Sequence, residues 1–162
     1  MSDKQCIHLF QLNSHRSIVP ADTLCRQLRH NKIFISLIQE PPTYLDSVIR
    51  FKGYEVYVGC NGTTRPRACV ITSSNIIGWK MPELSDSDCV AISTKWDKTR
   101  VVFASVYMPD NGNLVTSHTV RNLVEYCQRY KVPLLLAVML MHIILYEAAL
   151  TSMTEVKHFW SF

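Results

Sequence analysis

The chain has 162 residues, of which 48% are hydrophobic and 19% are charged, and its formal net charge is +4. This length and composition fit one ordinary domain with a hydrophobic core and exclude a disordered chain. The small positive charge permits contacts with phosphate groups without requiring them. The six cysteines show no C-x-x-C spacing, so a zinc site is not expected.

Hydrophobic periodicity predicts a mixed α/β chain. Apolar runs bounded by turn residues predict strands, and apolar residues at helical spacing predict two helices. Pro20 and Asp22 supply start signals for the first helix. In strand-like runs aromatic residues are usually core residues, so Tyr54, Tyr57 and Trp79 are expected to pack inside. The strands are expected near 5–13, 33–39, 54–59, 67–72, 89–96, 100–107 and 132–136, and the helices near 20–30 and 117–130.

Polar side chains stand where three of these strands end. Asn13 ends the first, Glu40 follows the second and precedes Pro41, and Tyr107 ends a third shortly before Pro109. Strands that each end in a polar residue are typical of a catalytic rim on a sheet. Taken alone, Glu40 is more often a solvated loop residue, whereas beside the other two strand ends it is a candidate ligand for a hard cation such as Mg²⁺.

Four short motifs occur in order over about residues 5–136. They are Gln-Leu-Asn at 11–13, Leu-Ile-Gln-Glu-Pro at 37–41, Arg-Pro-Arg-Ala-Cys-Val-Ile at 65–71 and Ser-Val-Tyr-Met-Pro at 105–109. Each motif alone is weak, but their order and separation resemble the endonuclease/exonuclease/phosphatase family. The likeness is greatest to the apurinic-type endonuclease at the start of the reverse-transcriptase polyprotein of non-LTR retrotransposons.

This resemblance implies a fold, a reaction and a set of roles. The fold would be α/β, a partial αββα four-layer sandwich, and the reaction Mg²⁺-dependent nicking of DNA. Glu40 would bind the metal, Asn13 would organise its surroundings, and Tyr107 would contact the scissile phosphate. Arg65 and Arg67 would contact the nucleic-acid backbone, although a solvated loop explains these two arginines equally well.

The family motif expected after the strand at 132–136 is replaced in this chain. Family members have a segment of the kind Gly-Cys-Asp-Ala-Asn-Ala-His-His, whose Asp and Asn are essential for hydrolysis. Here residues 137–144 read Ala-Val-Met-Leu-Met-His-Ile-Ile, with Met139 and Met141 in place of the Asp and the Asn. With suitable third bases, a one-base shift of the expected codons reads as residues 137–143. We therefore predict a frameshift at about Leu136, which is typical either of a decayed element copy or of an error in the gene prediction. Residues 1–136 would be the first part of the domain, and 137–162 a frameshifted tail that is poorly ordered or an opportunistic helix.

The expected function follows from the resemblance to the family and from the replacement of its Asp and Asn motif. We predict that the chain is a DNA-nicking endonuclease domain. We also predict that it is inactive, because the Asp, the Asn and the terminal His of the family are missing. The alternative is a remnant that binds nucleic acid without catalysis, or that has no function. The N-terminus is polar and has no signal peptide, which predicts an intracellular protein, nuclear if functional. The apolar run at 134–145 is too short to cross a membrane and predicts an exposed sticky patch instead.

Overall fold

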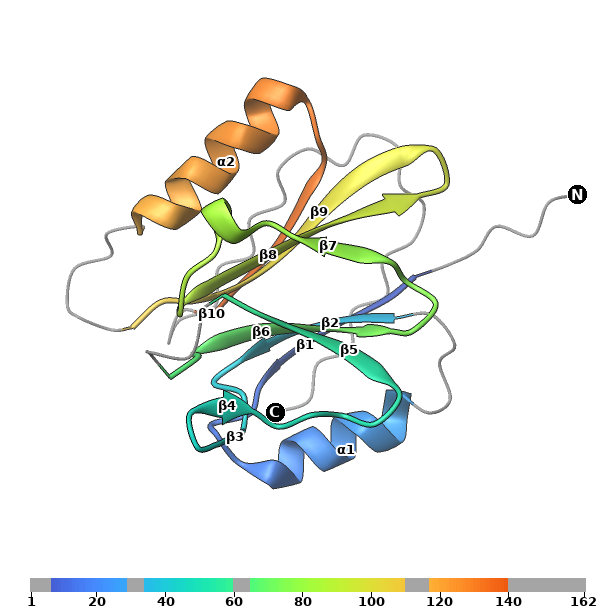
Figure 1. Cartoon of the computed structure of the whole chain (residues 1–162), viewed down its shortest axis with the longest axis vertical. Helices are drawn as coiled ribbons and strands as arrows, with labels where there is room; N and C mark the ends of the chain where they lie inside the picture. Colours follow the sequence, from blue (N-terminus) through green and yellow to red (C-terminus); the bar gives the residue numbers. More distant parts are fainter. Residues whose placement is uncertain (1–6, 29–33, 60–64, 110–116, 140–162) are drawn as a thin grey trace, which may run out of the picture.

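The computed structural model describes residues 7–28, 34–59, 65–109 and 117–139. Two four-stranded sheets face each other, and one helix covers the outer face of each (Figure 1). The elements are β1 (His8–Asn13), α1 (Ile18–Leu28), β2 (Phe34–Gln39), β3 (Thr43–Tyr44), β4 (Ser47–Val48), β5 (Tyr54–Val58), β6 (Ala68–Ser73), β7 (Gly78–Lys80), the 3₁₀ turn η1 (Pro82–Leu84), β8 (Cys89–Trp96), β9 (Thr99–Tyr107), α2 (His118–Tyr130) and β10 (Leu134–Met139).

The two sheets share a pattern of one parallel and two antiparallel pairings. The first sheet has the order β1-β2-β6-β5, with β1 parallel to β2. The second has the order β10-β9-β8-β7, with β10 parallel to β9. Because β1 and β2 run in the same direction, their carboxyl ends lie at the same edge, and so do those of β9 and β10. The short strands β3 and β4 form a separate hairpin after β2.

Three apolar layers hold the sandwich together, because alternate residues of each buried strand face opposite sides. Between the sheets, Ile35 and Leu37 of β2 pack against Ile92 and Phe103 of the second sheet. On the outer face of the first sheet, Phe34 and Ile38 pack against the apolar face of α1. The outer face of the second sheet packs on α2 through Val120, Leu123 and Cys127.

Helix α2 begins and ends with recognisable capping interactions. The backbone N–H of Val120 donates to the Ser117 hydroxyl at 3.2 Å, so Ser117 is the N-cap. Lys131 adopts a left-handed conformation after the last turn, and its N–H donates to the Gln128 carbonyl at 3.2 Å. The predicted helix at 117–130 therefore agrees with the structure to one residue.

Several predicted features differ from the structure. Helix α1 begins at Ile18, two residues before the expected start. The strands β3, β4 and β7 were not predicted, since two or three residues are too few to show a periodic pattern. The expectation for Trp79 was wrong: its side chain, on the edge strand β7, is 55% exposed. Tyr54 and Tyr57 pack as expected, Tyr54 with its ring edge-on to Phe34.

Strand β10 begins two residues later than predicted and continues three residues further. Ala137 is buried between the sheets at 5% exposure, and Met139 pairs with Tyr107. The strand can continue because Ala137 fits the core between the sheets and the apolar Val138 packs against the outer face of the second sheet. The proposed boundary after 136 thus falls inside a strand, whereas most of the predicted tail, 140–162, lies outside the described residues. Within the part of the chain that is described, no helix is long and apolar enough to cross a membrane.

Candidate functional site

The carboxyl ends of β1 and β2 place Asn13 and Glu40 at one edge of the first sheet. Asn13 pairs in register with Gln39, the residue before Glu40. Beyond the strands, the backbone N–H of Ser14 donates to the Gln39 carbonyl at 3.0 Å, and that of Arg16 donates to the Glu40 carbonyl at 2.8 Å. The Ser14 hydroxyl donates to the same Glu40 carbonyl at 2.5 Å. These bonds fix the two chain segments side by side where both strands have ended.

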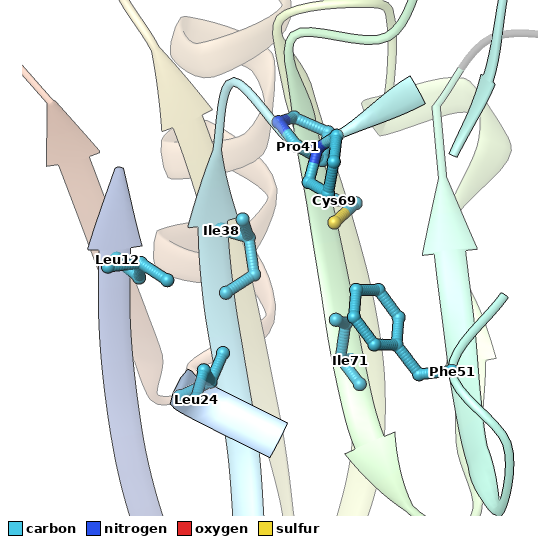
Figure 2. A pocket seen from close by; sticks show the side chains of 8 residues that line it. Leu12, Leu24, Ile38, Pro41, Phe51, Cys69 and Ile71 are labelled. Carbon is cyan, nitrogen blue, oxygen red and sulfur yellow. The ribbon is translucent and has the colours of Figure 1, made fainter. Parts of the chain in front are cut away.

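Glu40 adopts a left-handed backbone conformation, with φ of 47°. Such a conformation is uncommon for residues other than glycine and is retained only where the surroundings hold it. Here the Glu40 N–H donates to the Arg67 carbonyl at 2.8 Å, and the next two residues, Pro41 and Pro42, are buried. Both prolines line a small apolar cavity between α1 and the first sheet, together with Phe51 (Figure 2). The cavity has room for about one water molecule, so its walls anchor the chain after Glu40 and do not form a ligand site.

Two basic side chains lie beside the Glu40 carboxylate. Its oxygens lie 3.5 Å from His15 Nδ1 and 3.9 Å from Arg16 Nε, and the Glu40 side chain is 19% exposed. Asn13 is oriented by a separate bond, because its Oδ1 accepts the backbone N–H of His15 at 2.8 Å. The loop that follows β1 thus supplies basic partners for the carboxylate that follows β2.

Arg67 connects this edge to the second sheet. Its guanidinium donates two hydrogen bonds to the Asp88 carboxylate, both at 2.5 Å, and lies 5.2 Å from the centre of the Tyr107 ring. The Tyr107 N–H donates to the Asp88 carbonyl at 2.8 Å. Through Arg67, the structure brings Glu40 and Tyr107 to the same end of the sandwich. We call this end, with Asn13, Glu40, Arg67, Asp88 and Tyr107, the rim.

A buried amide lies directly beneath the rim, and the sequence reasoning missed it. Gln39 is fully buried, and its Nε2 donates to the Ser105 hydroxyl at 3.0 Å and to the Ala137 carbonyl at 3.4 Å. The Ser105 hydroxyl in turn donates to the Ile38 carbonyl at 2.9 Å. This bridge ties β2 to β9 and β10. The available signal was a glutamine inside an otherwise apolar run, immediately before Glu40.

The two arginines predicted to contact nucleic acid lie in different environments. Arg65 is exposed and donates from Nε to the Thr43 hydroxyl at 2.8 Å. Arg67 is about one-third exposed and is held by Asp88. Among the described residues, Arg65 has no carboxylate partner, so its charge is available to a ligand in a way that the charge of Arg67 is not.

The rim fits a divalent cation only in part. No group of three histidine, cysteine, aspartate or glutamate side chains that could hold a metal occurs within the described ranges. Asp88 is engaged by Arg67, and Asp86 accepts the backbone N–H groups of Asp88 and Cys89 and the Thr119 hydroxyl. Glu40 is left as one carboxylate between basic groups. Because Mg²⁺ is usually bound by one or two carboxylates together with substrate phosphates, these residues do not form a metal site by themselves.

Cysteine chemistry has no support at the described positions. Cys69, Cys89 and Cys127 are buried free thiols. Burial raises the pKa of Cys69, and burial followed by the nearby Asp86 and Asp88 carboxylates raises the pKa of Cys89 to about 12. A thiol that stays protonated and buried is a poor nucleophile. These residues are therefore core residues.

Comparison with known proteins supports the fold. No protein-family model matches the sequence, and no curated protein matches it. Among solved structures, the chain is similar to the endonuclease domain of TRAS1, a telomere-specific non-LTR retrotransposon, with a TM-score of 0.62 and 17% sequence identity. The match covers 79% of this chain and 56% of that domain, so the chain spans little more than half of the neighbour's length. The α/β sandwich expected from the sequence is thus the observed fold, of the type found in that endonuclease.

Proposed function

We propose that the rim is part of the site of a phosphodiester-hydrolysing domain that nicks DNA, and that this chain does not itself catalyse the reaction. The observation that carries the proposal is the meeting of Asn13, Glu40 and Tyr107 at one end of a sandwich with the fold of a retrotransposon endonuclease. In the proposed site, polar groups from both sheets would contact the phosphate.

Each rim residue has a proposed role that its surroundings support. The Glu40 carboxylate would be a metal ligand once substrate phosphate adds further oxygens, and Mg²⁺ would then offset the negative charge of the phosphate. The Asn13 amide would orient that carboxylate or a phosphate oxygen. The Tyr107 hydroxyl would donate to the phosphate. Arg65 and Arg67 would contact the DNA backbone, Arg67 only after it exchanges Asp88 for a phosphate oxygen.

The proposed inactivity depends on the end of β10. Met139 pairs with Tyr107 in the second sheet, so the residue in the position of the expected Asp reaches the rim. A thioether neither accepts a proton from water nor binds a hard cation. Among the described residues, the rim would therefore lack the group that positions and deprotonates the attacking water, and we attribute this proposed loss to the frameshift at about Leu136.

A second candidate function is nucleic-acid binding without catalysis. It is favoured by Arg65, whose charge has no carboxylate partner among the described residues, and by the net charge of +4. Binding that depends on phosphate contacts weakens steeply as the salt concentration rises. Such a protein, if functional, would act where DNA is found, in the nucleus.

Two assays on the purified chain test the proposal. In the first, supercoiled plasmid is incubated with the chain and Mg²⁺, and we expect no nicking above that of the Glu40→Ala variant. In the second, calorimetry with Mg²⁺ alone should show weak binding at most. Nicking that Glu40→Ala abolishes would show that another acid replaces the lost one, and tight stoichiometric Mg²⁺ binding would show that the metal site is complete.

A further inference from the structure

The hairpin β3–β4 presents two large apolar side chains to solvent. Thr43 pairs with Val48 and Tyr44 with Ser47, which leaves Leu45 and Asp46 as the turn. Tyr44 is 74% exposed and Leu45 is 81% exposed. Exposed apolar side chains that lie singly are common, whereas two at the tip of one hairpin form a projecting contact surface.

The geometry of this turn explains Asp46 but not Leu45. Leu45 and Asp46 both have positive φ, 47° and 59°. Two-residue turns of this kind favour asparagine, aspartate and glycine, because other residues are strained there. Leu45 therefore has a strained backbone, and because it is 81% exposed its side chain gains little stabilisation from burial. Strained residues that contribute little to packing are typical of ligand-binding positions.

The hairpin is anchored beside the rim. Thr43 lies three residues after Glu40, and the intervening prolines are buried. The Ile49 N–H donates to the Pro42 carbonyl at 3.1 Å and closes the base of the hairpin. Figure 1 shows the hairpin near α1, at the end of the first sheet where β1 and β2 terminate. The Thr43 hydroxyl accepts from Arg65, so a guanidinium lies at the foot of the strand that carries Tyr44.

We propose that the tip of this hairpin binds a DNA strand that crosses the rim, with Tyr44 stacked on a base, Leu45 against the adjoining sugar and Arg65 on a neighbouring phosphate. This inference rests on the proposed DNA substrate of the rim. Stacking on an aromatic ring suits any base, because every base has a π-face. The Asp46 carboxylate repels phosphate, which places the backbone on the Arg65 side of the tip. The hairpin would therefore hold DNA by contacts that do not involve the metal.

The test uses fluorescence anisotropy with labelled single-stranded and duplex oligonucleotides of the same sequence, without Mg²⁺. Tyr44→Ala should weaken binding about tenfold, as expected for the loss of one stacked base, while Tyr44→Phe should retain it. Arg65→Ala should weaken binding to all sequences and reduce the slope of log K against log salt by about one. Tyr130→Ala is the matched control, because Tyr130 is also exposed, at 60%, but lies at the far end of α2. It should leave the affinity unchanged.

A second variant guards against a folding defect. Leu45→Gly removes the apolar side chain and relieves the positive φ, so it should weaken DNA binding without lowering stability. If the chain binds DNA and both Tyr44→Ala and Leu45→Gly bind as tightly as Tyr130→Ala, the hairpin proposal is overturned and the proposed function stands. If the unaltered chain binds neither oligonucleotide, the proposed function fails together with the hairpin proposal. A larger loss on one of the two oligonucleotides identifies the form of DNA that reaches the tip.

Discussion

The two sheets reach the rim with different chemistry. In the first sheet, β1 ends at Asn13 and β2 is followed by Glu40, and backbone hydrogen bonds hold both strand ends. In the second, β9 ends at Tyr107, but its parallel neighbour β10 ends at Met139. The strand pairing is the same in both sheets. Register depends on buried apolar positions and site chemistry on a single polar one. A sheet edge would therefore keep its register after the replacement that we propose at Met139.

The largest effect is expected where the end of β5 in the first sheet meets the loop before β8 in the second. A Cβ atom on Gly59, at the end of β5, would lie 1.7 Å from the Asp86 carbonyl oxygen in the loop before β8. Gly59→Val should therefore lower the free energy of unfolding by about 3 kcal/mol, the upper part of the usual range for overpacking. Gly53→Ala is the control, because its Cβ meets no atom within 4 Å and only its φ of +87° is strained. Urea denaturation that gives equal losses for the two variants would contradict this contact.

The bridge beneath the rim should give the next largest effect. Gln39→Ala removes a donor from Ser105 and from the buried Ala137 carbonyl, and should lower the free energy of unfolding by about 2 kcal/mol. Gln11→Ala is the matched control, because the Gln11 amide also approaches a β10 carbonyl, that of Val138 at 3.5 Å, but is exposed. Its effect should stay within about 0.5 kcal/mol. Equal stability of the two variants in urea would show that β10 is not held by Gln39.

Breaking the Arg67–Asp88 pair should have a smaller effect on stability, and it should change stability and DNA affinity in opposite directions. Asp88→Asn keeps the size of the side chain but removes its charge, and because the pair is partly exposed the loss of stability should be about 1 kcal/mol. The same change should raise DNA affinity a few-fold, since Arg67 becomes available to phosphate and a repelling carboxylate is lost. Anisotropy measurements with unchanged or weaker DNA binding would identify Arg67 as a purely structural link between the sheets.

The last effect concerns the pH dependence of stability, and it should be alike in both sheets. Burial raises the pKa of Cys69 in β6 and the pKa of Cys89 in β8, the latter to about 12. In the unfolded chain these thiols ionise from about pH 9, so between pH 9 and 12 the folded state binds more protons than the unfolded state. Stability is therefore full below pH 9 and should fall as pH rises above it. Denaturation curves at pH 8 and 10 test this, and Cys69→Ala should flatten the dependence.

The long elements could be predicted from the sequence because each carries its own pattern. Cys89–Trp96 is a mostly apolar run of eight residues, which indicates a buried strand. The helix after Ser117 has apolar residues at helical spacing over 13 residues. The three strand ends at Asn13, Glu40 and Tyr107 were also readable, since each polar residue stands at the end of an apolar run.

Features that depend on distant partners could not be predicted. Gln39 is bonded to a residue 66 positions away, and Arg67 to Asp88 across the two sheets. Trp79 was expected inside because its own segment is apolar, but the exposure of an edge strand depends on what pairs beside it. Likewise β10 continues past Leu136 because Ala137 fits the core, whatever its coding history.

We propose that Asn13, Glu40 and Tyr107 keep the arrangement of a catalytic site, and that Met139 at the end of β10 makes this site inactive. The most direct test is Mg²⁺-dependent nicking of supercoiled plasmid by a version of the chain read in the proposed original frame. In this version Asp and Asn replace Met139 and Met141, and the chain continues to the length of the retrotransposon endonuclease domain that it is similar to. We expect this version to nick the plasmid, its Glu40→Ala variant to lose the activity, and the present chain not to nick. A restored version that binds DNA but does not nick it, or one whose nicking survives Glu40→Ala, would contradict the account.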